Sequence, residues 1–258
     1  MQAKVTETYS VHNVIGAYFC TEQQFEVLTV KKNIVVLTGA GISAESGLKT
    51  FRGADGLWEN YRIEDVATPF AWARDQALVL RFYNERRKDV RQATPNAAHK
   101  ALVALEEKFN VTIITQNIDD LHERAGSKNI IHLHGEIMKS RSSADENLLY
   151  DCTGDIQPGD LCELGSQLRP HVVWFHEAVP MMDLAANKCR EADILVVIGT
   201  SLQVYPAAGL IHCAPYRSIK FLVDPDFQDR PNLNNLEIIT AKAGKGVPEL
   251  VKKLMVKY

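Results

Sequence analysis

Runs of apolar residues alternate along the chain with stretches whose apolar positions recur at helical spacing. The continuous apolar runs predict buried strands, which cover residues 34–37, 111–115, 130–133, 194–198, 219–223 and 236–240. The stretches between them predict helices over residues 68–92, 96–109 and 247–256. Strands that alternate with helices indicate an α/β fold, in which a parallel sheet is covered by helices on both faces.

Two segments depart from this pattern. Residues 1–30 are mostly polar and carry no recognisable motif, so we expect an N-terminal extension there. Residues 136–170 are polar, rich in Ser, Asp and Gly, and show little periodicity. Neither segment contributes a strand to the predicted sheet.

The first predicted strand runs directly into a glycine-rich turn of the form G-x-G-x-x-A, at residues 39–44. Gly39 would let the strand turn sharply, Gly41 would let a pyrophosphate approach the backbone, and Ala44 would keep the next helix near the sheet, where its free N–H groups bind anions. On its own, an ordinary glycine-rich turn is an equally good interpretation. A dehydrogenase would carry an acidic residue ~20 positions later, whereas this chain continues with Phe-Arg-Gly at 51–53 and Asp-Gly-Leu-Trp at 55–58.

Residues 39–58 resemble the signature of the sirtuins, the NAD-dependent protein deacylases. Three further motifs follow in family order, namely Gln-Asn-Ile-Asp at 116–119, His-Gly at 134–135 and Gly-Thr-Ser at 199–201. The resemblance implies a catalytic domain over residues 31–258. Its fold would be a Rossmann-like parallel sheet with helices on both faces and a small, reduced second lobe, inserted at about residues 50–95 and 136–170.

The resemblance makes His134 and Asn117 the expected catalytic residues. A period of two places His132 and His134 on the same face of a strand, so spacing alone cannot choose between them; Gly135 after His134 matches the family motif, and His132 would be structural. The acyl oxygen of a modified lysine would attack the ribose carbon as nicotinamide leaves, and His134 would then activate a ribose hydroxyl. Free lysine, nicotinamide and an acylated ADP-ribose would result.

The resemblance also implies NAD as the cofactor. Several of its expected contacts have ordinary alternatives, because Asn117 and Ser201 are also good helix caps. Asp224 and Asp226 stand where the family commonly carries Asn-x-Glu; both can accept ribose hydroxyls, but Asp224 cannot donate as an amide would. The expected cofactor-binding residues are Gly39, Ala40, Gly41, Ser43, Ala44, Phe51, Arg52, Trp58, Gln116, Asn117, Ile118, Asp119, Gly199, Thr200, Ser201, Asp224, Asp226 and Ala243.

Tyr83 and Arg86 lie three residues apart on a predicted helix and therefore share a face. Charge alone favours a solvated helix face, since Arg86, Arg87, Lys88 and Arg91 cluster. The Tyr-x-x-Arg pattern resembles that of the sirtuin branch that removes succinyl and malonyl groups. The chemistry suits this activity, since Arg can bind a carboxylate through two hydrogen bonds and Tyr can donate a further one. The expected substrate-binding residues are Ala67, Tyr83, Arg86, Val173, Trp174 and Phe175, the last three on a strand edge to which an extended peptide can add.

The family's small lobe holds a structural zinc on two cysteine pairs, but this segment offers only Cys152 and Cys162. A structural zinc site needs four ligands, usually paired closely in sequence. We therefore expect no metal and a lobe held by packing. His171 and His176 lie nearby, which keeps a Cys2His2 site open as an alternative.

Composition excludes several classes of protein. The chain has 258 residues, a net charge of −3 and 46% hydrophobic residues, which favours a globular protein and gives no electrostatic case for nucleic acid or a membrane. The N-terminus lacks a signal-peptide pattern, and the five scattered cysteines suit a reducing cytoplasm.

Acylated-lysine proteins are the expected partners. The alternatives are an NAD glycohydrolase or ADP-ribosyltransferase, and a non-enzymatic ADP-ribose-binding module.

Overall fold

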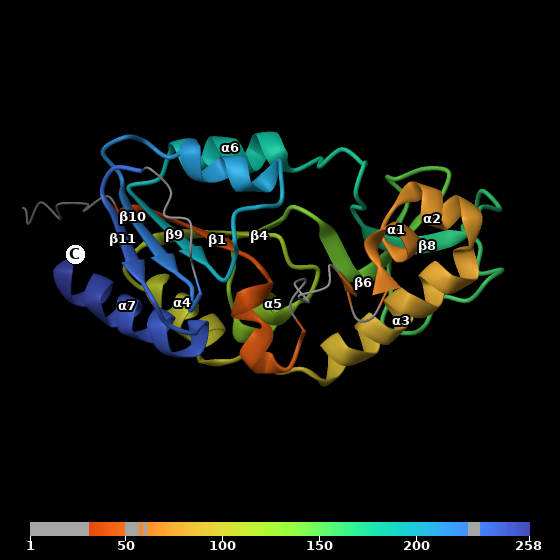
Figure 1. Ribbon diagram of the computed structural model, residues 1–258, viewed down its shortest axis with the longest axis horizontal. Helices are drawn as coiled ribbons and strands as arrows, with labels where there is room; N and C mark the ends of the chain where they lie inside the picture. Colours follow the sequence, from red (N-terminus) through yellow and green to blue (C-terminus); the bar gives the residue numbers. More distant parts are fainter. Residues whose placement is uncertain (1–30, 50–56, 59–60, 227–232) are drawn as a thin grey trace, which may run out of the picture. The chain divides into compact units, whose positions relative to one another are not determined.

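The computed structural model describes residues 31–49, 57–58, 61–226 and 233–258, all within the unit Lys31–Tyr258. Its centre is a six-stranded parallel sheet with the strand order β11-β10-β9-β1-β4-β5 (Figure 1). The order runs outward from the adjacent strands β1 and β9, so the switch point of the sheet lies between them. The strands are β1 Asn33–Thr38, β4 Asn110–Thr115, β5 Ile130–His132, β9 Ile194–Ile198, β10 Ile219–Val223 and β11 Leu236–Ile239.

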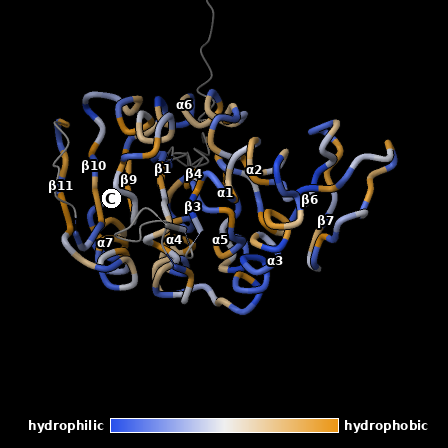
Figure 2. The backbone as a smooth tube through the Cα atoms, turned by 45° about the vertical axis from the view of Figure 1, so that its right-hand side comes forward, coloured by the Kyte–Doolittle hydropathy of each residue, from blue (hydrophilic) through white to orange (hydrophobic). Residues whose placement is uncertain are grey.

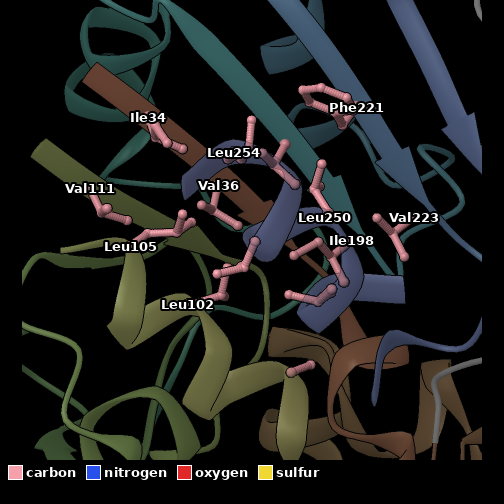
Figure 3. Packing of buried hydrophobic residues seen from close by; sticks show 14 of the residues in the cluster. Ile34, Val36, Leu102, Leu105, Val111, Ile198, Phe221, Val223, Leu250 and Leu254 are labelled. Atoms are coloured by element: carbon pink, nitrogen blue, oxygen red, sulfur yellow. The ribbon is translucent and has the colours of Figure 1, made fainter. Parts of the chain in front are cut away.

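Both faces of this sheet are buried, because successive side chains of each strand point to opposite sides. Ile34 and Val36 of β1 pack with the helices α4 (Ala97–Leu105) and α7 (Ala243–Lys257) (Figure 3). Val35 and Leu37 pack on the other side with α6 (Met182–Arg190) and η3 (Ala207–His212). Each fully buried aliphatic side chain stabilises the fold by about 1.5–3 kcal/mol. The predicted α/β fold with helices on both faces is confirmed.

A separate antiparallel sheet builds the small lobe, in the order β7-β6-β8. Three helices and a two-stranded hairpin accompany it, and α3 buries Phe82 and Tyr83 although its tube is mostly hydrophilic in colour (Figure 2). These elements are β2 Leu57–Trp58, β3 Tyr61–Arg62, α1 Ile63–Val66, α2 Pro69–Arg74, α3 Gln76–Gln92, β6 Gly135–Ser142, β7 Leu149–Asp151 and β8 Leu168–Val172.

The single helix predicted over 68–92 is wrong, because the structure has two helices there, α2 and α3. Thr68 caps α2 as predicted, by accepting the Ala71 N–H over 3.0 Å. Asp75 then leaves helical geometry, and its carboxylate accepts the Leu78 N–H over 2.9 Å, which starts α3. An aspartate that caps a new helix ends the preceding one.

Other predicted boundaries also differ. The helix over 96–109 ends at Leu105, although Phe109 is still buried in the core. The closing helix, predicted over 247–256, begins already at Ala243, so Pro248 lies inside it. The helix expected after the glycine turn is replaced by two short 3-10 turns, of which the second ends at Gly47 with φ +91°. Ala44 is exposed there, so its predicted packing role is wrong.

The sequence patterns missed several elements. These are α5 (Leu121–Ala125), α6, η3 and the small sheet. None of the described helices is both long and apolar enough to cross a membrane.

Candidate active site

Two glycine-containing loops meet at the carboxyl ends of β1 and β9. The Gly41 N–H donates to the Gly199 carbonyl over 2.8 Å, and a Cβ added to Gly41 would lie 2.5 Å from Gly199 Cα. Gly199 has φ +59°, a left-handed conformation that favours glycine. The missing Cβ of Gly41 therefore makes room for the other loop. The paired loops sit at the switch point, where open α/β sheets bind their ligands.

Polar side chains behind these loops bond one another. Ser43 Oγ donates to Asp119 Oδ2 over 3.0 Å, and Asn117 Nδ2 donates to Ser43 Oγ and to the Gly39 carbonyl, each over 3.2 Å. All three side chains are buried. Burial raises the pKa of Asp119 to about 6, against hydrogen bonds from the Leu121 N–H and from Ser43. The network joins the loop after β1 to the loop after β4.

His134, between β5 and β6, is held in one defined tautomer. Its Nδ1 lies 2.9 Å from the Gln116 carbonyl. A carbonyl can only accept, so Nδ1 carries the proton and Nε2 is free to accept one. Burial lowers the pKa of His134, which favours the neutral base. Gln116 in turn donates to Thr200 Oγ1 over 3.2 Å, which connects the base to the loop after β9.

The glycine after His134 is required by the packing. Gly135 has φ +79°, and a Cβ there would lie 2.2 Å from the His171 carbonyl of β8. The His134-Gly135 motif therefore marks the point where the small sheet passes the end of the parallel sheet.

His132 has a different environment from His134. Its Nε2 lies 2.6 Å from Glu123 Oε1 and its Nδ1 lies 3.3 Å from the Asn117 carbonyl. Burial opposes its charge, but the Glu123 carboxylate outweighs burial and raises the pKa of His132. A histidine that donates from both nitrogens cannot act as a base, so these contacts fit a structural role.

An aromatic cluster surrounds Tyr83 in the small lobe. The Tyr83 ring lies 5.1, 6.1 and 6.4 Å from the rings of Phe82, Trp58 and Trp174. Tyr83 is fully buried, yet its hydroxyl and the Trp174 Nε1–H have no hydrogen-bond partner among the described residues. Burial raises the pKa of Tyr83, so the hydroxyl stays protonated and can donate. Ala67, also buried, contributes a small side chain to the same cluster.

Arg86 does not lie on a solvated face. Its guanidinium carbon lies 5.1 Å from the Phe82 ring centre, and its side chain is only 14% exposed. Nε and Nη2 donate to Asp89, whereas the buried Nη1 has no partner among the residues described. Arg87 is fully buried and donates to the Ile137 carbonyl. The solvated-face interpretation therefore fails for these two arginines.

The predicted substrate segment connects the two parts of the site. The Val173 N–H donates to the His134 carbonyl over 2.9 Å, and the Phe175 N–H donates to the Ala67 carbonyl over 3.0 Å. Trp174, between them, is buried. The segment thus runs from the catalytic-base candidate to the acyl-pocket candidate.

Comparison with known proteins identifies the family. The Sir2 family model matches residues 39–206. The chain belongs to the Sir2 family. A Helicobacter pylori protein named NAD-dependent protein deacylase is 50% identical over 224 residues, which cover 87% of this chain and 98% of that protein. The crystal structure of a Sir2 homolog–NAD complex has a TM-score of 0.80 at 41% identity over 88% of this chain and 90% of that one. A structure described as Sir2–p53 peptide–NAD+ has a TM-score of 0.73 at 29% identity, covering 88% and 95%.

The remaining predicted residues lie in several parts of the chain. Phe51 and Arg52 lie outside the described residues. Ala40 and Ser201 belong to the two paired loops, and Ile118 accepts the Ile137 N–H at the join with the small sheet. Trp58, predicted to meet the cofactor, packs with Phe82 and Tyr83. Three further predicted residues lie at the other end of the sheet's sequence. Asp224 Oδ1 accepts the Asp226 N–H after β10, and Ala243 is buried at the start of α7.

Sequence reasoning missed a buried histidine pair beneath the Sir2 loops. The rings of His99 and His122 lie 4.9 Å apart, and both side chains are fully buried. His122 Nε2 lies 3.2 Å from Thr38 Oγ1, at the end of β1. His99 Nδ1 accepts the Asn96 N–H, and Asn96 Nδ2 donates to the Ile42 carbonyl. A polar Asn-x-x-His at a helix start, which forms a capping box here, was the available signal.

The donors in the small lobe do not fit a four-ligand zinc site. Cys162 Sγ bonds Ser142 Oγ at 3.2 Å, whereas Cys152 packs with Leu80 and Ile156. Among the described residues, no group of three or more His, Cys, Asp or Glu is arranged to hold a metal ion. The Cys2His2 alternative is therefore not assembled there. Asn84 instead ties the lobe together, by donating to the Ile156 carbonyl over 2.9 Å.

Proposed function

We propose that this chain removes acyl groups that end in a carboxylate, succinyl and malonyl, from lysine side chains of proteins. The coarser activity follows from the family and from relatives about 50% identical: the chain is an NAD-dependent protein deacylase. The preference among acyl groups is the proposal. The observation that carries it is the pair of buried donors, Tyr83 Oη and Arg86 Nη1, that have no partner among the described residues.

The loops at the switch point fit NAD. Gly39, Gly41 and Gly199 keep side chains out of the junction, and Asp224 places a carboxylate at the end of the adjacent strand β10. Asn117 and Ser43 would orient the nicotinamide end. When bound, NAD supplies an activated ribose carbon with nicotinamide as its leaving group.

His134 is the group that takes a proton. Its Nε2 is unprotonated because Nδ1 is held by the Gln116 carbonyl. A ribose hydroxyl that reaches Nε2 can lose its proton there, and the lowered pKa of His134 keeps the base form available. Asn117 and Asp119 hold the loop beside it. His132, bonded to Glu123, keeps its proton and would not compete.

The small lobe would hold the acyl group. A buried cation that donates to a carboxylate forms a strong, charge-assisted bond, and Tyr83 adds a neutral donor. Buried polar groups almost always have partners, so two donors without one indicate an acceptor supplied by the substrate. Ala67 leaves room because its side chain is small. An acetyl group has no carboxylate and would leave both donors unsatisfied.

Arg86→Met tests the proposal, because Met keeps most of the volume and deletes the charge. A charge-assisted bond is worth ~1.5–3 kcal/mol, so kcat/KM on succinyl-lysine should fall about ten- to a hundredfold. Activity on acetyl-lysine should change much less. Arg81→Met, on the exposed face of the same helix, is the matched control and should change neither. Equal losses on both substrates would mean that Arg86 only supports the structure.

A further inference from the structure

An ion pair stands behind the substrate segment. Arg169 Nη1 donates to Glu177 Oε1 over 2.7 Å, and Nη2 donates to Glu177 Oε2 over 3.2 Å. The two side chains are 9% and 19% exposed, so water scarcely reaches the pair. Arg141 Nη2 adds a longer contact to the same carboxylate. This bidentate geometry fixes the relative orientation of the guanidinium and the carboxylate as well as the distance between them.

Both partners also touch the segment between them. Glu177 Oε2 accepts the Trp174 N–H over 2.8 Å. Arg169 Nη2 donates to the Val172 carbonyl over 3.1 Å, and the Arg169 guanidinium carbon lies 3.2 Å from the Trp174 ring centre. The pair therefore fixes the start, the middle and the end of residues 172–177, and it fixes the plane of the Trp174 ring.

The other neighbours of Trp174 belong to the acyl pocket. Its ring lies 6.4 Å from Tyr83 and 5.7 Å from Trp72. The main chain on either side donates to the His134 and Ala67 carbonyls. A shift of this segment would move the wall of the pocket and the main-chain links to His134 and Ala67 at once.

Stability alone does not explain the pair. A buried ion pair is often no more stabilising than apolar residues of the same volume, because both charges lose their hydration. Its distinctive property is a fixed geometry. We propose that Arg169 and Glu177 are positioning residues, which hold Trp174 and residues 172–177 in the shape that receives the acylated lysine of a protein substrate. This inference rests on the proposed function of the segment, but not on which acyl group is preferred.

The experiment separates positioning from stability with a double-mutant cycle. Arg169→Met leaves Glu177 only its longer contact with Arg141, and Glu177→Met leaves Arg169 without its partner, so each should lower the melting temperature and raise the peptide KM. The double variant removes both charges of the pair and leaves Arg141 its longer contact with Glu146, so its melting temperature should recover part of the way to the wild type. Its peptide KM should stay about tenfold high, because misplaced binding groups are not restored by apolar packing.

Milder variants keep the test decisive if the single Met variants fail to fold. Arg169→Lys keeps the charge but loses the planar fork, and Glu177→Gln keeps the shape but loses the charge. Both should raise the peptide KM. The Kd for NAD should stay within about twofold of the wild-type value, because the Arg169–Glu177 ion pair (the clamp) belongs to the small sheet and not to the loops of the parallel sheet. Arg74→Met, which breaks an exposed ion pair with Asp65 in the same lobe, is the control and should leave the peptide KM unchanged.

Two results would overturn the proposal. One is a peptide KM that returns to the wild-type value together with stability in the double variant, which would make the pair merely structural. The other is an unchanged peptide KM in folded Arg169→Lys and Glu177→Gln. Each protein is assayed on acetyl- and succinyl-lysine peptides of the same sequence. If the clamp positions the segment, loss of the clamp should raise the KM for both peptides by the same factor. Failure of the acyl preference would instead appear as equal kcat/KM values in the wild type.

Discussion

At the carboxyl end of the parallel sheet, the predicted site residues bond one another. Ser43, Asn117 and Asp119 form one hydrogen-bonded network, and the glycine loops hold each other by backbone contacts. In the proposed acyl pocket of the small lobe, Tyr83 Oη and Arg86 Nη1 are buried without a partner among the described residues. The first region is complete in itself and can preorganise a cofactor common to a whole family. The second leaves donors for the substrate to satisfy, and so it can set specificity.

The largest expected effect comes from His134, the proposed base between the two regions. His134→Ala should lower kcat by about a hundred- to ten-thousandfold, because only the proton acceptor is removed. Binding of an acylated peptide should change little, since the acyl pocket is intact. Turnover and peptide affinity are measured on protein whose circular dichroism matches the wild type. Near-normal turnover in such a protein would rule out His134 as the base.

Acid should weaken the parallel-sheet region through its buried histidines. Burial lowers the pKa of His99 to about 4 and of His122 to about 3, below their ordinary value of about 6.5. The unfolded chain therefore binds more protons as pH falls below 6.5, and the stability present above that pH is lost toward pH 4. Asp119 has the opposite effect on stability, because burial raises its pKa to about 6. Its contribution to the free energy of unfolding is present below its ordinary pKa and is lost as pH rises through 6.

The two histidines should outweigh the single aspartate. We expect the free energy of unfolding in urea to be about 2–3 kcal/mol lower at pH 5 than at pH 7. His122→Gln keeps a side chain that can bond Thr38 but cannot titrate, so it should flatten this dependence. A variant with the wild-type dependence on pH would place the acid-sensitive groups elsewhere.

For the small lobe, the expected effect of metal removal is nil. The purified protein should carry no stoichiometric zinc, and a strong chelator should leave its melting temperature unchanged. Elemental analysis after dialysis checks the first statement. About one zinc per chain would contradict the account and would indicate ligands beyond Cys152 and Cys162.

The two regions also differ in how well the sequence predicts them. The strands of the parallel sheet were found within one or two residues, because a strand buried on both faces reads as a continuous apolar run. The loops that follow these strands were therefore predicted to lie together, since parallel strands bring their carboxyl ends to one edge of the sheet. The small sheet was missed because β6 is mostly polar and β7 has only three residues.

Side-chain roles were predicted less evenly. The spacing of Tyr83 and Arg86 placed them on one helix face, but only the structure shows that Arg86 is buried over Phe82. Trp58 lies five residues before a short helix in the chain, and its packing against Tyr83 depends on the tertiary fold. The histidine pair and the Arg169–Glu177 clamp join residues distant in sequence or separated by a turn, so no local periodicity reveals them.

We propose that the acyl pocket selects a carboxylate. Mass spectrometry of one peptide bearing acetyl-, malonyl- or succinyl-lysine, incubated with the wild-type protein with and without NAD, tests it most directly. The account predicts that the succinyl and malonyl groups are removed with the higher kcat/KM and only when NAD is present. An acetyl peptide processed as fast as the succinyl peptide would contradict it.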